Sequence, residues 1–258
     1  MGKSQRLRVG DLRAIYRLIG ECRELGDDAA TWRRHLLAGV RRQFDAAVGI
    51  GGEGTIRHPR FFVYESEIPA ECSRYVASML AGELADSPMV LRFPAPSSGP
   101  ITRLREQSIP DGEWYRSAEF NEGCRGDQID GGLMSVYPLS AGDCDVMVVH
   151  PWLGRRLGRR QSRLARLLHG EVGPLVGGAL AGASEPGPAE LSPRLRQTLD
   201  ALLEGDGEKQ VAARLGLSRE TVHVYVKALY RHFRVSSRAE LLAQFLRRHR
   251  AGRPAGAS

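Results

Sequence analysis

Residues 191–242, LSPRLRQTLDALLEGDGEKQVAARLGLSRETVHVYVKALYRHFRVSSRAELL, decide the organisation of this chain. Leucines recur along this stretch at helical spacing, and glycines interrupt them. Ser192-Pro193 is a typical helix start, because serine accepts a hydrogen bond from a free amide and proline has no amide hydrogen to lose. We predict four short helices, with a tight Gly216-Leu217 turn between the second and the third.

The third predicted helix, residues 218–233, has two different faces. Its apolar stripe, which we expect to pack inward, consists of Val222, Val226, Leu229 and Phe233. The opposite side carries Arg219, His223, Lys227, Arg231 and Arg234, with Val224 pointing outward among them. Cations match DNA phosphates, these side chains donate to base edges, and an exposed valine suits a thymine methyl group. A solvated helix face would explain the charges alone, but the turn, the serine cap and the two faces occur together.

These features resemble the DNA-binding domain of LuxR-type regulators, also called the GerE or NarL/FixJ-type helix-turn-helix. The resemblance rests on LSPR, VAARLGLS, ETVHVYVKALYRHF and VSSRAELL, and it covers about a fifth of the chain. His223 stands where the family commonly has Lys, and Tyr225 where it commonly has His. Leu195 replaces the usual glutamate, which removes the carboxylate of a capping box.

The resemblance implies a role for each exposed residue. The base-facing positions are His223, Val224 and Lys227. The expected phosphate contacts are Lys209, Ser218, Arg219, Thr221 and Arg231. The family dimerises through its fourth helix, which here carries Leu241, Leu242, Phe245 and Leu246. A dimer of this kind predicts an inverted-repeat site on double-stranded DNA.

The distribution of charge separates this region from the rest of the chain. From Pro188 onward there are 13 Lys and Arg against 7 Asp and Glu, which accounts for most of the net charge of +7. The remainder is nearly neutral, so nucleic-acid binding is expected only in the C-terminal part. We predict an N-terminal domain at 1–180, a linker at 181–189 (AGASEPGPA), a helix-turn-helix domain at 190–250 and a disordered tail at 251–258.

The N-terminal domain is expected to be an α+β, sensor-like domain in which helices flank an antiparallel sheet. Helical spacing predicts helices at 6–25, 29–44, 68–84 and 157–168, and a surface helix at 114–125. Strands are expected at 46–50, 61–64, 89–93, 132–139 and 144–150, the last two as a hairpin. This layout resembles GAF and PAS domains, although no diagnostic motif is present.

Several other functional classes fit less well. Gly49, Gly51 and Gly54 satisfy the dinucleotide-binding pattern, but an aromatic strand follows them, so we predict a hairpin loop. Acyl-homoserine-lactone receptors of the family use spaced aromatics and an Asp-Pro step, where this chain has Asp86-Ser87-Pro88. Phosphorylation receivers begin with a parallel α/β pattern, and the N-terminal domain does not resemble a sigma factor's promoter-melting module. No nucleophile–base pair or carboxylate pair forms a local motif, so we expect no enzyme.

The cysteines indicate a reducing compartment. Cys22, Cys72, Cys124 and Cys144 are far apart and form no C-x-x-C pair, so free thiols are expected. A metal site that combines some of them with His150 is the alternative. No signal peptide or membrane span is evident, and we predict a cytoplasmic protein without cofactors.

Arg103, Arg105, Trp114 and Tyr115 either line a pocket or pack at the surface. A small-molecule or protein signal acting on the N-terminal domain is expected, and one alternative is that this domain inhibits DNA binding until it is relieved.

Overall fold

The structure is a computed structural model, and it describes residues 6–56, 59–68, 73–80, 87–95, 98–139, 142–183, 188, 191–233 and 235–251. Two compact units make up the chain. One is formed within Met1–Cys22 and Trp32–Val176, and the other within Arg23–Thr31 and Gly177–Ser258. No helix in the described ranges combines the length and the hydropathy needed to cross a membrane.

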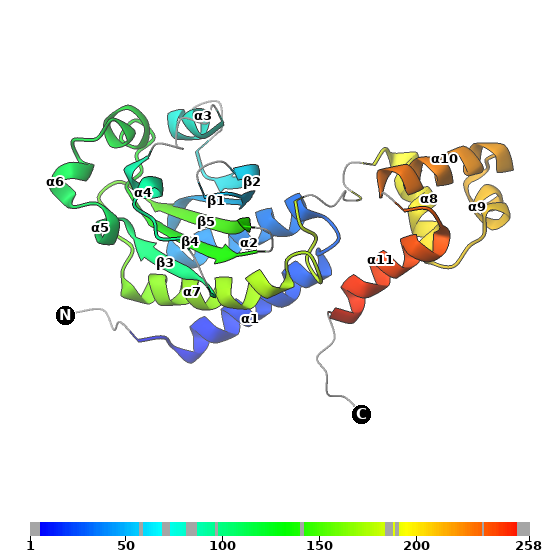
Figure 1. Cartoon of the computed structure of the whole chain (residues 1–258), viewed down its shortest axis with the longest axis horizontal. Coiled ribbons are helices and arrows are strands. Elements are labelled where there is room, and N and C mark those ends of the chain that lie inside the picture. The colour runs from blue at the N-terminus through cyan, green and yellow to red at the C-terminus, as the bar shows by residue number, and fades with distance from the viewer. Residues whose placement is uncertain are drawn as a thin grey trace. The chain divides into compact units, whose positions relative to one another are not determined.

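The first unit contains a five-stranded antiparallel sheet with the order β2-β1-β5-β4-β3 (Figure 1). Its strands are β1 (Ala46–Gly54), β2 (Pro59–Ser66), β3 (Ile101–Leu104), β4 (Leu133–Pro138) and β5 (Cys144–Pro151). The hairpins β1–β2 and β4–β5 agree with the sequence prediction, whereas β3 was not predicted. The expected α+β class with an antiparallel sheet is confirmed.

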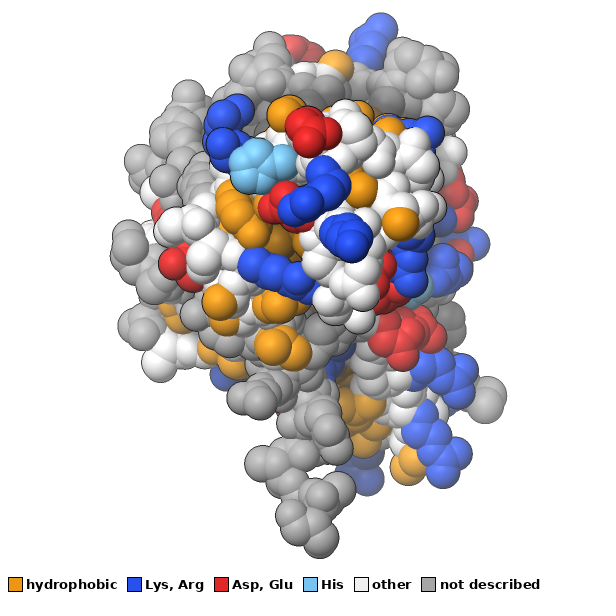
Figure 2. All heavy atoms as spheres, turned by 90° about the vertical axis from the view of Figure 1, so that its right-hand side faces the viewer, with side chains coloured by type: hydrophobic (Ala, Val, Ile, Leu, Met, Phe, Trp, Pro, Cys, Tyr) orange, Lys and Arg blue, Asp and Glu red, His pale blue; other side chains and the backbone are white. Residues whose placement is uncertain are grey.

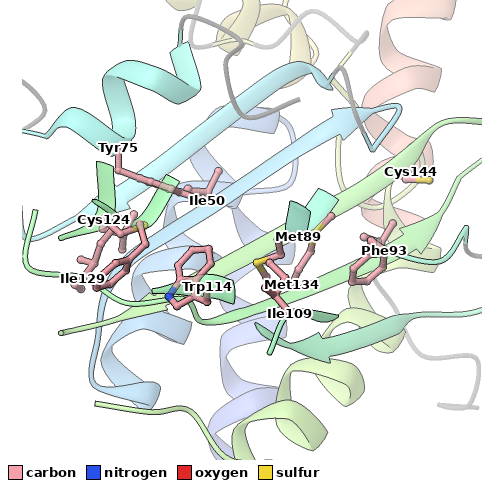
Figure 3. Packing of buried hydrophobic residues seen from close by; sticks show 14 residues of the cluster. Ile50, Tyr75, Met89, Phe93, Ile109, Trp114, Cys124, Ile129, Met134 and Cys144 are labelled. Carbon is pink, nitrogen blue, oxygen red and sulfur yellow. The ribbon is translucent and has the colours of Figure 1, made fainter. Parts of the chain in front are cut away.

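Helices cover both faces of this sheet. One face packs against α2 (Ala29–Phe44) and α7 (Arg159–Val172), and α1 (Val9–Glu24) packs on α2 through Leu18 and Gly39. The other face carries α3 (Arg74–Leu80), α4 (Pro88–Leu91), α5 (Arg105–Ser108), α6 (Asp111–Trp114) and the π-helix η3 (Glu119–Cys124). Trp114, Ile109, Met89, Phe93 and Met134 pack together between these short helices and the sheet (Figure 3).

The glycine-rich stretch is part of a strand, so the predicted loop there was wrong. β1 continues through Gly54, and both neighbouring strands pair with it. A Cβ atom on Gly49 or Gly51 would lie 3.4 Å from side-chain atoms of Leu37, so glycine at these positions lets α2 approach the sheet closely. After Gly54 the chain enters β2, and no phosphate-binding helix follows.

Two further predictions on the other face were also wrong. The strand expected at 89–93 is the short helix α4, because Ser87 accepts a hydrogen bond from the amide of Met89 at 3.2 Å and Pro88 stands in the first turn. The surface helix expected at 114–125 is α6 followed by η3, and it buries Trp114 (0% exposed), Phe120 and Cys124. Of the helix expected at 68–84, the structure shows α3, whereas residues 69–72 and 81–86 lie outside the described residues.

The second unit contains the four predicted C-terminal helices. They are α8 (Pro193–Leu203), α9 (Glu208–Leu215), α10 (Arg219–His232) and α11 (Arg238–Ala251). The beginning of the expected linker is buried: Ala181 is inaccessible, and its amide donates to the carbonyl of Gly26 at 2.7 Å. Residues 184–187 and 189–190, and the expected tail at 252–258, lie outside the described residues.

Candidate nucleic-acid interface

The turn before α10 fixes the direction of that helix. Gly216 ends α9 with φ of 65°, a left-handed conformation that an L side chain adopts only with strain. Ser218 then caps α10, and its hydroxyl oxygen accepts a hydrogen bond from the amide of Thr221 at 3.1 Å. Both features follow the sequence prediction of a helix-turn-helix.

The apolar stripe of α10 is the centre of the domain core. Val222 and Leu229 are 0% exposed, and Val226 and Phe233 are nearly so. They pack with Leu199 and Leu202 of α8 and Val211 of α9. Because one side of α10 is buried along its whole length, the opposite side must face away from the core.

That outward side carries the residues predicted for DNA. His223, Lys227 and Arg231 are exposed, and Val224 is 61% exposed. Figure 2, viewed from the side where α9 and α10 lie in Figure 1, shows Lys, Arg and His side chains among hydrophobic and acidic ones. Lys209 on α9 and Arg219 at the start of α10 are also exposed.

Internal contacts constrain three of these side chains. Nδ1 of His223 lies 3.2 Å from a carboxylate oxygen of Glu208. A carboxylate accepts, so Nδ1 carries the hydrogen and Nε2 is the atom left to face DNA. The hydroxyl of Ser218 donates to the Glu220 carboxylate, so in its 3.0 Å contact with the Thr221 hydroxyl it accepts, and both hydroxyl hydrogens are used within the domain.

Acidic side chains limit the positive charge of this face. Arg214 pairs with Glu204 and Asp206, so its charge is balanced within the domain. Hydrogen bonds from its own backbone amide and from Ser218 lower the pKa of Glu220 at the start of α10. A phosphate at this helix end would compete with the Glu220 carboxylate, which places the main cationic contribution farther along α10.

Residues 189–244 match the family model described as bacterial regulatory proteins, luxR family. Residues 189–244 are a LuxR-family DNA-binding domain. A comparison of the whole chain with curated proteins finds no match.

Two solved structures resemble the whole chain weakly. One is SdiA in complex with octanoyl-rac-glycerol, with 14% identity, a TM-score of 0.46 and coverage of 93% of this chain and 96% of that chain. The other is SdiA from Escherichia coli, with 14% identity, a TM-score of 0.43 and coverage of 91% and 97%. At this level of similarity the functional assignment rests on the LuxR-type domain alone.

Two of the four side chains predicted for dimerisation are buried in the LuxR-type domain. Leu241 and Phe245 are 0% and 3% exposed, because they pack on the α8–α10 core, with Phe245 edge-on to Phe233. These two side chains are therefore part of the core and unavailable to a partner. Leu246 is 55% exposed and Leu242 is half-buried, so they remain on the outer side of α11.

In the N-terminal unit, three residues far apart in sequence form a Ser-His-Asp arrangement that no local sequence motif predicts. The Ser135 hydroxyl lies 2.8 Å from Nδ1 of His169, whose Nε2 lies 3.1 Å from the carboxylate of Asp145. Ser135 is 0% exposed, and its hydroxyl also contacts the hydroxyl of Thr102 at 2.7 Å, so it is engaged inside the protein. Asp145 also pairs with the buried Arg33, whose charge lowers the pKa of Asp145. This cluster ties α2, α7 and three strands together.

The four residues considered for either pocket lining or surface packing are instead mostly internal. Trp114 and Tyr115 donate to the two carboxylate oxygens of Asp130, at 2.8 and 2.9 Å. The buried Arg105 pairs with Asp111, and its guanidinium lies over both aromatic rings. Arg103 is half-buried on β3.

The three described cysteines and His150 form no metal-binding group. Cys22, Cys124 and Cys144 are buried free thiols, burial raises the pKa of Cys22 to about 12, and Cys72 lies outside the described residues. Nδ1 of the buried His150 lies 3.0 Å from the carbonyl of Asp130. Among the described residues, no three His, Cys, Asp or Glu side chains are grouped closely enough to hold a metal ion.

Proposed function

We propose that this protein is a transcriptional regulator that binds a specific DNA sequence as a dimer, with the helix of residues 218–233 in the major groove. The observation that carries this proposal is the two-sided α10. Val222, Val226 and Leu229 are buried, while His223, Val224 and Lys227 are exposed on a helix whose start is fixed by a serine cap. The match of residues 189–244 to the LuxR family supports the same reading.

Sequence preference comes from three side chains in this proposal. Lys227 donates to guanine O6 or N7, and Val224 packs on a thymine methyl group. Glu208 accepts a hydrogen bond from Nδ1 of His223, so Nε2 is the ring nitrogen assigned to the base edges.

Affinity comes mainly from contacts to phosphates. We assign these contacts to Lys209, Arg219 and Arg231, which are exposed, and to the hydroxyls of Ser218 and Thr221, which would exchange a hydrogen bond inside the domain for one to a phosphate. The dimer contact is assigned to Leu242 and Leu246 on the outer side of α11. Two such subunits present their recognition helices to adjacent major grooves, which predicts an inverted repeat.

The N-terminal unit is proposed to be a regulatory module with a GAF/PAS-like role, acting on the dimer or on DNA binding. Its sheet is covered by helices on both faces, and it carries the pocket described below. Because the proposed target is chromosomal DNA, we place the protein in the cytoplasm of a bacterium. The alternative function is a signalling module in which the N-terminal unit blocks DNA binding until a ligand or protein partner relieves it.

Binding of the purified full-length protein to fragmented genomic DNA, followed by sequencing of the retained fragments, tests this proposal. A regulator enriches a short inverted repeat, and competition with bulk DNA does not remove it. Equal retention of all sequences would reduce the protein to a general basic DNA binder. A fragment from Pro188 onward keeps the whole α8–α11 core. If this fragment retains the repeat and the full-length protein does not, the N-terminal unit blocks DNA binding, as the alternative function states.

A further inference from the structure

A pocket of about 710 Å³ opens on the side of the N-terminal unit that carries the short helices. It lies between α3, the start of α4, the end of α5, α6 and η3. Buried Tyr75 and Ile109 and half-buried Pro88 give it apolar walls. Sites for small organic ligands have volumes of roughly 300–1,000 Å³ and are mostly apolar with a few fixed polar groups.

Glu119 is the fixed polar group of this pocket. It lies in the first turn of the π-helix η3, a rare local structure that is frequent at functional sites. One carboxylate oxygen, Oε2, accepts a hydrogen bond from the buried hydroxyl of Ser87 at 2.6 Å. Ser87 is itself held as the cap of α4, so the position of the carboxylate is set by two elements.

Within the described ranges, Glu119 has no Lys, Arg or His as an ionic partner. The other charged groups that line the pocket are already engaged or lie at its exposed rim. Glu113 forms a bidentate ion pair with Arg92, in which the two guanidinium NH2 groups lie 2.6 and 2.9 Å from the two carboxylate oxygens. Arg116 is exposed and donates to the carbonyl of Gly112, and Glu122 is exposed.

Among the described residues, no donor reaches Oε1 of the half-buried Glu119 carboxylate, so its burial carries a desolvation cost. Burial raises the pKa of Glu119, which is the direction expected when water is replaced by apolar walls without a compensating cation. A cation at the free oxygen would remove this cost, and an anion would increase it. An uncharged ligand would leave the carboxylate without a counter-charge.

We propose that this pocket binds a small organic amine, whose ammonium group pairs with the Glu119 carboxylate and whose apolar part packs on Tyr75 and Ile109. The amine is the signal of the regulatory module, a statement that rests on the proposed function. Binding of the amine to the pocket is independent of that function and can be measured without DNA.

The test is calorimetric titration of the full-length protein with three primary amines, benzylamine, phenethylamine and hexylamine, and with benzyl alcohol, phenethyl alcohol and hexanol as uncharged counterparts. At neutral pH we expect at least one amine to bind about tenfold more tightly than its alcohol, because only the amine pairs with the carboxylate. If no amine exceeds its alcohol, the proposal is overturned.

Two variants locate the binding. Glu119→Gln keeps the shape of the side chain and removes the charge, and we expect it to reduce the preference for amine over alcohol to about one. Glu122→Gln, at the exposed rim of the same pocket, is the matched control and should keep the preference. An amine preference that survives Glu119→Gln contradicts the assignment. The comparison in the unmodified protein stands even if a variant fails to fold.

The link to regulation is tested separately, by measuring the affinity for the selected DNA repeat with and without the preferred amine. A change in affinity that Glu119→Gln abolishes supports both the ligand and its regulatory role. Amine binding without any change in DNA affinity leaves the pocket assignment intact and overturns the regulatory role. If no DNA repeat is selected, the proposed function is overturned. The preference for amine over alcohol still tests whether the pocket binds an amine.

Discussion

The buried His150 should make the stability of the N-terminal unit depend on pH between about 7 and 5. Burial lowers the pKa of His150 to about 4 from the ordinary value of 6.5. Its Nδ1–H donates to the carbonyl of Asp130 at 3.0 Å, while Nε2 is buried and has no partner within the described residues. A proton on Nε2 would therefore be buried without an acceptor.

The sign and the size of the effect follow from these two pKa values. Because the folded pKa lies below the unfolded one, the unfolded chain binds more protons between about pH 6.5 and pH 4. The stability that His150 contributes is complete above pH 6.5 and is lost as the pH falls toward 4. One pKa unit corresponds to 1.36 kcal/mol, so acidification from about pH 7 to pH 5 should reduce the free energy of unfolding by about 2 kcal/mol.

Urea unfolding followed by tryptophan fluorescence measures this loss of stability in the N-terminal unit. All three tryptophans, Trp32, Trp114 and Trp152, lie in the N-terminal unit, so fluorescence reports that unit alone. The comparison is between the unmodified protein and His150→Gln at each pH. Glu119, whose pKa is raised, contributes in the opposite sense in both proteins and cancels in the difference.

We expect the unmodified protein to lose about 2 kcal/mol more than His150→Gln over this range. A variant that is less stable at every pH but has the same slope would refute the reasoning, since it would show that His150 contributes packing without any coupling to protons.

Three further predictions concern DNA binding and the buried charge cluster. Lys227→Ala should weaken binding to the selected repeat by about 1–3 kcal/mol at fixed salt, measured by fluorescence anisotropy, while Arg214→Ala, whose charge is balanced within the domain, should change it little. Val226→Asp places a charge at a position that is 3% exposed, so loss of helical circular dichroism and of DNA binding is expected; a folded, active variant would contradict the assigned core face. Asp145→Asn should destabilise the N-terminal unit by about 3 kcal/mol in urea, because Arg33 loses a buried counter-charge and His169 loses its carboxylate partner; an unchanged midpoint would show that Glu53 alone satisfies Arg33.

The C-terminal helices could be predicted from sequence because each of their determinants is local. Ser192, Gly216 and Ser218 fix helix ends within a few residues, and the stripe of α10 repeats at helical spacing. The N-terminal unit depends more on contacts between distant residues. Gly49 and Gly51 of β1 are explained by their close approach to Leu37 on α2, which the sequence does not show, so this stretch was predicted as a loop.

The same reason explains which site residues could not be predicted. Glu208 lies fifteen residues before His223, and their contact depends on the angle between two helices. Glu119 meets Ser87 only because the fold brings the start of η3 to the N-cap of α4, at a sequence separation of 32 residues. Ser87-Pro88 nevertheless carried a local helix-start signal that the strand prediction at 89–93 overlooked.

The burial of Leu241 and Phe245 limits how the proposed dimer can form. A domain of four short helices must use one side of α11 to complete its core, and only the opposite side is left for a partner. Leu242 and Leu246, one helical turn apart, provide a narrow apolar seam, much smaller than a stable interface of about 800 Å² per partner. We therefore infer that α11 alone associates weakly. Two half-sites on one DNA molecule would raise the effective concentration of the second subunit, so dimerisation through this domain should depend on DNA or on the N-terminal unit.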